Sequence, residues 1–103
     1  MITNKLIISG IYSFLDINNE PQYVILVEEK NNILTFFQIT NFKMNTREKI
    51  IELLEKNLFG FFFQLNLNRQ EDLKIFNESI SGYMGIVSNS IQEKLLKKLH
   101  KYK

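Results

Sequence analysis

The side chains that most often carry catalysis or hold metals are scarce in this chain. It contains no cysteine, and its single histidine, His100, lies three residues from the end of the sequence. Thiol nucleophiles, disulfides, zinc sites built on cysteines and histidine-based catalytic triads are therefore absent or nearly so. The remaining candidates are carboxylates, hydroxyls, lysines and two arginines, Arg47 and Arg69, and their spacing indicates no particular reaction. We therefore expect no metal and no cofactor, and a protein that acts mainly through its surface.

Length and charge narrow the class of protein further. A chain of 103 residues predicts a single domain, spanning residues 1–103, with one hydrophobic core. The formal net charge of +2 is too small for the dense basic surface of a dedicated nucleic-acid-binding protein. No apolar run approaches the roughly 20 residues that span a bilayer, and the N-terminal residues lack the pattern of a signal peptide. We expect a cytoplasmic protein with no membrane partner.

The first part of the chain, residues 6–42, has the composition of β-strands, with many β-branched and aromatic residues. Pro21 lacks an amide donor, which places it at the entry of a second strand over Gln22 to Glu29. The segment Tyr23 to Val27 is apolar on both alternating faces, as expected for a strand at the centre of a sheet or inside a small barrel. The pair Asn31–Asn32 tolerates a positive φ and suits a two-residue hairpin turn.

The second part of the chain predicts helices and two further strands. A helix is expected over Asn45 to Asn57, and the alternation in Phe59 to Leu67 predicts a strand. The polar stretch from Asn68 to Ser79 is compatible with a short helical turn. Ile80 to Val87 predicts a last strand, and Ser90 begins a capping-box pattern that opens a C-terminal helix. The apolar face of that helix comprises Ile91, Leu95, Leu96 and Leu99.

Together these elements predict an α+β fold. The sheet is expected to be an antiparallel β-meander or a small SH3-like barrel of four to five strands. One internal helix and a C-terminal helix complete the expected architecture.

The aromatic strand and the lysine-rich last helix supply the candidate binding residues. Strict alternation predicts that Phe59, Phe61 and Phe63 are packed inside, which leaves the opposite face of the strand for contacts. The lysines near the end of the helix could meet the phosphates of a nucleic acid, although cations there also complement the helix dipole. The candidate contact residues are Phe62, Gln64, Arg69, Lys94, Lys97 and Lys101.

Four segments of the chain share a pattern with one known family. A glycine followed by an apolar and aromatic run occurs at Gly10–Phe14, and a strand introduced by a proline occurs at Glu20–Val27. A strand that closes on a threonine occurs at Ile33–Asn41, and Tyr83–Ser88 forms a strand ending in a serine before a helix. These segments resemble the small-barrel toxins of the MazF/PemK type. The resemblance implies a ribonuclease that cuts single-stranded RNA by attack of the 2′-hydroxyl on the adjacent phosphate.

The resemblance also implies which residues would be catalytic. In the family, an arginine just before the proline and the threonine that closes the third strand carry much of the chemistry. Thr40 matches the threonine, but Glu20 occupies the arginine position, and Lys43 is the cation that could substitute. A carboxylate at position 20 would repel the phosphate that it should stabilise. We therefore predict that the protein has no intrinsic ribonuclease activity.

Three interpretations of function remain open. The first is a small non-enzymatic binding protein whose partner is a host protein, as for an inhibitor encoded by a phage or a mobile element. The second is a MazF/PemK-like endoribonuclease toxin, which would act on RNA and bind an antitoxin. The third is a nucleic-acid-binding module without catalysis. We favour the first interpretation because the net charge is small and arginine is scarce. Whether the protein forms a homodimer also remains open.

Overall fold

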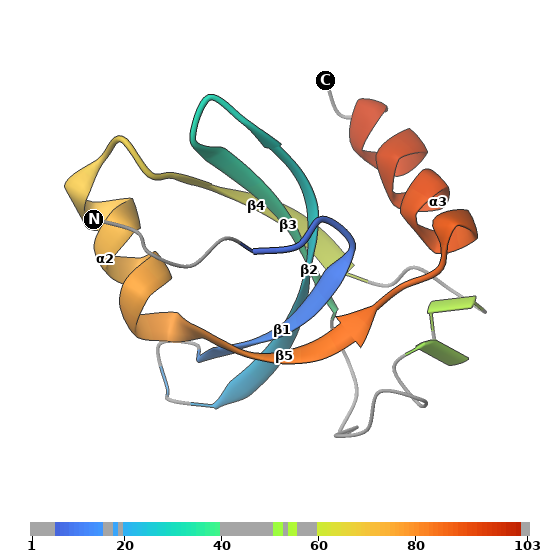
Figure 1. Ribbon diagram of the computed structural model, residues 1–103, viewed down its shortest axis with the longest axis horizontal. Coiled ribbons are helices and arrows are strands. Elements are labelled where there is room, and N and C mark those ends of the chain that lie inside the picture. The colour runs from blue at the N-terminus through green and yellow to red at the C-terminus, as the bar shows by residue number, and fades with distance from the viewer. Residues whose placement is uncertain are drawn as a thin grey trace.

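Five antiparallel strands and two helices are described from end to end in a computed structural model, which covers residues 6–15, 18, 20–39, 51–52, 54–55 and 60–101. The elements are β1 (Gly10–Leu15), β2 (Pro21–Lys30), β3 (Ile33–Ile39), β4 (Gly60–Asn66), α2 (Gln70–Ser79), β5 (Ile80–Ile86) and α3 (Asn89–His100). The strand order is β4-β3-β2-β1-β5 (Figure 1). The predicted α+β fold with an antiparallel sheet is therefore confirmed.

The sheet is open, because β4 and β5 are its two edges. The alternative of a closed small barrel is therefore wrong. The first four strands form a meander, in which each strand pairs with the next along the chain. Residues 51, 52, 54 and 55 are helical and belong to the helix predicted over Asn45 to Asn57; the rest of that prediction lies outside the described residues.

The turn between β2 and β3 forms as the sequence predicts. Asn31 and Asn32 have φ angles of 53° and 65°, in the left-handed region that asparagine tolerates better than most residues. Pro21 is the first residue of β2, where its missing amide hydrogen costs no hydrogen bond inside the sheet.

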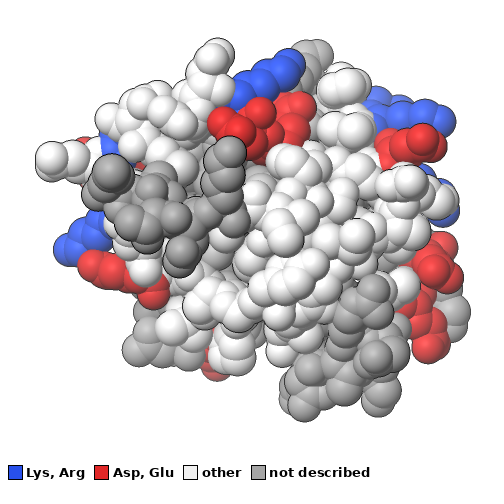
Figure 2. All heavy atoms as spheres, in the orientation of Figure 1, with Lys and Arg blue, Asp and Glu red and all other residues white. Residues whose placement is uncertain are grey.

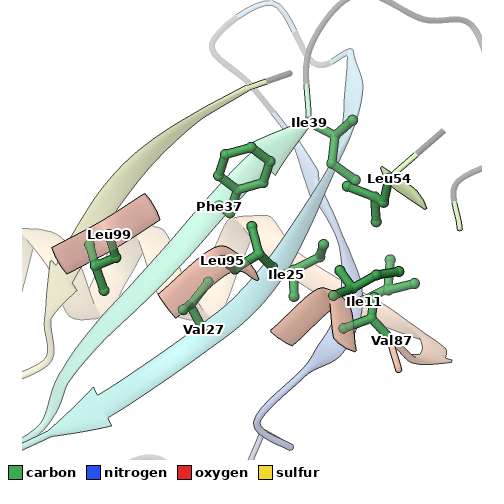
Figure 3. Packing of buried hydrophobic residues seen from close by; sticks show 10 residues of the cluster. Ile11, Ile25, Val27, Phe37, Ile39, Leu54, Val87, Leu95 and Leu99 are labelled. Carbon is green, nitrogen blue, oxygen red and sulfur yellow. The ribbon is translucent and has the colours of Figure 1, made fainter. Parts of the chain in front are cut away.

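The central strand β2 is buried on both faces, as its continuous apolar sequence predicts. On one face Ile25 and Val27 pack against α3 and against Leu54. Figure 3 shows Leu95 and Leu99 of α3 directed toward these strand residues. Among the described residues, α3 contributes most of the side chains that cover this face.

On the other face, the sheet curls around a second core cluster. Val24 and Leu26 pack there with Phe36, and α2 contributes its one buried residue, Phe76. The rings of Phe14 in β1 and Phe63 in β4 lie 5.4 Å apart between centroids, although their strands are not neighbours. The concave face must therefore be strongly curved. Figure 1 shows α2 at the open side, between β4 and β5 in the chain.

Both helices are short and amphipathic. The helix α2 is longer than the single turn expected between Asn68 and Ser79, because Phe76 and the half-buried Leu73 give it an apolar face against the sheet. The predicted apolar face of α3 is confirmed, since Ile91, Leu95 and Leu99 are buried. No helix among the described residues is long and apolar enough to cross a membrane.

The start of α3 differs from the prediction by two residues. Ser88 is the capping residue in place of Ser90, and its Oγ accepts a hydrogen bond from the amide of Ile91 at 3.3 Å. The side chain of Gln92 then donates from Nε2 to the carbonyl oxygen of Val27 at 2.7 Å. Because the β2–β3 register shifts between Leu26 and Glu28, this bond ties the helix to β2 where the ladder is irregular.

The burial of β4 differs from the predicted alternation. Phe61 is 49% exposed, whereas Phe63 and Phe62 are both half-buried, on opposite faces of the strand. The ring of Phe62 packs edge-on against Phe37 at 5.0 Å. The prediction that Phe61 is packed inside is therefore wrong. The strand β4 lies at the edge of the sheet and carries phenylalanines on both faces, and only some of these rings reach the core.

Two phenylalanine substitutions test this assignment of core and surface. We expect Phe36→Ala to lower the free energy of unfolding by about 3–5 kcal/mol, because the ring is fully buried. Phe61→Ala should cost no more than about 1.5 kcal/mol, since half of that side chain is already in contact with water. Urea unfolding of both variants measures the difference, and equal losses would show that the two rings are buried alike.

Candidate interaction surface

Exposed apolar side chains gather around β1 and β5. Seven large apolar residues are exposed among the described residues, and four of them belong to the segment leading into β1 or to β5. We define the β1–β5 apolar surface as these four residues, each between 45% and 52% exposed: Ile7, Ile8, Tyr83 and Ile86. A contiguous exposed apolar patch is uncommon on a monomer and often marks an interaction site.

A tight turn holds the two isoleucines of this surface at the start of β1. The amide of Gly10 donates to the carbonyl oxygen of Ile7 at 2.9 Å, which closes a four-residue turn with Ile8 and Ser9 in its middle. Ser9 has a φ of 72°, in the left-handed region that favours glycine and costs other residues about 1–2 kcal/mol. Turn positions are usually polar, but this turn carries two isoleucines, and both are exposed to solvent.

Hydrogen bonds to two other elements hold the strained residue in place. The amide of Ser9 donates to the carbonyl oxygen of Leu26 in β2 at 2.7 Å. The carbonyl oxygen of Ser9 accepts from the amide of Val87, just after β5, at 2.9 Å. The backbone of Ser9 therefore joins the central strand to the end of β5. A non-glycine residue held at positive φ by its surroundings is a feature that often accompanies functional sites.

The floor of the β1–β5 apolar surface is the ring of Tyr12, which is only 5% exposed. Its hydroxyl oxygen accepts a hydrogen bond from the amide of Ile7 at 2.8 Å, and its ring lies 5.6 Å from that of Tyr83. A Cβ at Gly10 would lie 2.8 Å from the Tyr12 ring, so the ring covers the glycine. Because Gly10 is paired with Ile86 and Tyr12 with Tyr83, the residues Ile7, Tyr83 and Ile86 all lie around this ring.

Charged side chains are absent from the segments that build this surface. Residues 6–15 and 79–92 contain no Asp, Glu, Lys or Arg. Figure 1 draws β1 and β5 at the front of the molecule, and the described side chains in that region of Figure 2 are white. Blue and red side chains lie around the periphery of that face, near one another. An apolar centre with a charged rim of both signs is the usual anatomy of a protein–protein interface.

Three of the predicted contact residues lie on β4 and the adjoining loop, and the structure assigns each a local role. Phe62 packs against the core, as described above. The Nε2 of the exposed Gln64 donates to Oγ1 of the buried Thr35, its partner in β3, at 3.1 Å. Arg69 donates to Oε2 of Glu71 at 3.2 Å, in an ion pair whose side chains are both largely exposed. Such exposed pairs contribute little to stability.

The predicted lysines lie together on α3, away from its buried face. Lys94, Lys97 and Lys101 are exposed, and among the described residues none forms an ion pair with them. Lys97 and His100 lie in the last turn, where positive charge complements the helix dipole. These three lysines therefore share the exposed part of α3, whereas Phe62 packs against the core cluster to which the buried residues of α3 belong.

The residues implied by the family resemblance are only partly described. Thr40 and Lys43 lie outside the described residues, and Glu20 is exposed immediately before β2. No group of three Asp, Glu or His side chains that could hold a metal occurs in the described part of the chain. Comparisons with protein-family models, with curated proteins and with solved structures find no match to this chain.

Sequence reasoning missed the β1–β5 apolar surface, although one signal was available. The two uncharged segments that form it are visible in the sequence, but uncharged runs also occur in buried strands. Ser9 has a positive φ that its residue type does not indicate, and Ile7 and Ile8 beside it are exposed. The exposure of the isoleucines therefore became evident only from the backbone.

Removing the hydroxyl of Tyr12 tests how the turn is held. We expect Tyr12→Phe to cost about 1 kcal/mol of unfolding free energy, because the amide of Ile7 loses its acceptor while the ring stays packed. Amide hydrogen exchange at Ile7 should accelerate in this variant. The matched control is Tyr83→Phe, which removes a hydroxyl from the neighbouring exposed ring. Unchanged exchange at Ile7 in Tyr12→Phe would show that the hydrogen bond does not hold the turn.

Proposed function

We propose that this protein is a non-enzymatic binding protein that acts through protein–protein contacts on the β1–β5 apolar surface. The observation that supports the proposal is the rigid presentation of apolar side chains on an uncharged surface, fixed by the hydrogen bonds of Ser9 and Tyr12. An inhibitor of a host protein, encoded by a phage or a mobile element, fits this mode of action.

The energetics of the surface suit a protein partner. Covering the exposed half of an isoleucine or tyrosine side chain contributes roughly 1 kcal/mol, so four such residues supply a modest but useful part of a binding free energy. The turn is already ordered, so its loss of conformational entropy on binding is small. Tyrosine is also enriched among the residues that dominate interface energies, which favours Tyr83 as an anchor.

The geometry of β5 favours docking through side chains over the addition of a strand. Gly82 and Gly85 have φ angles of 61° and 102°, and the β1–β5 register shifts twice, around Tyr12. Bulges and twists of this kind are how natural edge strands avoid pairing with other chains. The partner is therefore expected to cover the apolar face of the surface rather than to extend the sheet.

The two alternatives rest on other residues. A ribonuclease of the MazF/PemK type would depend on Thr40 and Lys43, and Glu20 still argues against it. Single-stranded RNA incubated with the protein should therefore stay intact in a gel assay; cleavage that disappears in Thr40→Ala or Lys43→Ala would establish the toxin instead. A nucleic-acid-binding module would depend on the lysines of α3 and on phosphate contacts.

Substitutions on and off the surface test the proposed function. Tagged wild-type protein should capture one defined host protein, and Ile86→Lys should weaken that capture at least about tenfold, since a charge would be buried in the contact. The matched control is Ile75→Lys, because Ile75 is an exposed isoleucine of α2 outside the surface. Quantitative mass spectrometry of the captured proteins provides the measurement.

Treatment with nuclease and with salt distinguishes a protein partner from a nucleic-acid partner. Capture that survives nuclease and moderate salt supports the proposal. Capture that is lost under both conditions, and in a variant with Lys94, Lys97 and Lys101 replaced by glutamate, would contradict it and favour the nucleic-acid-binding module.

A further inference from the structure

We infer that the β1–β5 apolar surface also binds a second copy of this chain, as a weak and reversible two-fold dimer. This inference rests on the proposed function, because both use the same surface. It adds that the protein covers its own contact surface, so that self-association and partner binding compete.

No like charges oppose a two-fold contact at the centre of this surface. In a two-fold contact, a residue near the symmetry axis meets its own copy, so a charged residue there would face a like charge. About a quarter of this chain is charged, at 23%, and most exposed elements carry charged side chains. The β1–β5 apolar surface is built from two segments without any charge, which removes the repulsion that opposes a symmetric contact.

The rim of the surface carries charges of both signs (Figure 2). Figure 2 shows side chains of both signs around the face that carries β1 and β5. A rim of mixed sign can pair with its own two-fold image, with blue groups opposite red ones, whereas a rim of a single sign would repel it. The formal net charge of +2 adds little long-range repulsion between copies. Neither the charges of the rim nor the net charge therefore opposes contact between two copies.

The exposed apolar area limits the strength of the contact. Only about half of each of four side chains remains to be covered, and stable dimers bury roughly 800 Å² on each partner. The four residues supply a minority of that area, so the surrounding uncharged polar surface must supply the rest. We therefore expect a dissociation constant of about 1–100 µM, at the weak end for specific interfaces.

Sedimentation at a series of concentrations tests the inference directly. Wild-type protein should change reversibly from the mass of one chain to twice that mass between about 1 and 500 µM. Tyr83→Lys and Ile86→Lys should remain single chains over the whole range, because each places two like charges in the contact. Ile75→Lys, on α2, should dimerise like the wild type.

The outcomes separate this inference from the proposed function. A wild-type protein that remains a single chain at every concentration overturns the dimer, and so does a dimer that persists in both surface variants. If the wild type stays a single chain but Ile86→Lys still loses capture of its partner, the proposed function stands and only the dimer is wrong. If the wild type dimerises, and adding the captured host protein converts the dimer to single chains, the dimer and the proposed function are both supported.

Discussion

The burial of β2 on both faces is the constraint on which the rest of the structure depends. Val24 and Leu26 point to one side of the sheet, and Ile25 and Val27 point to the other, and all four are nearly inaccessible to water. A strand of this kind needs an apolar cover on each side. The chain meets the need in two ways, with α3 and Leu54 on one face and with the curled sheet and α2 on the other.

The same constraint explains why an apolar surface remains exposed. The curled sheet is not closed, so its concave side must be completed by elements outside the ladder. Leu6, just before the turn, packs against the concave cluster, and Tyr12 lies across Gly10 with its hydroxyl bonded to Ile7. The segment that helps to cover the core thereby presents Ile7 and Ile8 on its outer side. Covering the core and displaying a contact surface are two consequences of one arrangement.

The elements that the sequence predicted well are those whose pattern has a single physical interpretation. The double-sided apolar run of β2 indicates a strand buried on both faces, the pair Asn31–Asn32 suits a turn with positive φ, and the apolar spacing of α3 suits a helix covering a sheet. The aromatic strand was harder, because β4 carries phenylalanines on both faces and alternation does not say which face is the core. Phe61 is exposed since the strand lies at the edge, which depends on the strand order and not on local sequence.

The candidate surface was the least predictable part of the molecule. The residues proposed from the sequence, such as Arg69 and Lys97, were chosen for their chemical type. In the structure Arg69 forms an exposed ion pair with Glu71, and Lys97 lies on the exposed face of α3. The β1–β5 apolar surface depends on contacts between distant segments, above all the bonds from Ser9 to Leu26 and Val87. Such contacts follow from the complete fold.

The most direct test of this account is the solvent accessibility of individual isoleucine methyl groups. Dilute protein with labelled isoleucine methyls can be titrated with a soluble paramagnetic probe and followed by NMR. We predict strong relaxation enhancement at Ile7, Ile8 and Ile86, and little at the buried Ile25. Protection of Ile7 and Ile86 equal to that of Ile25 in the dilute single chain would contradict the claim that the fold displays an apolar contact surface.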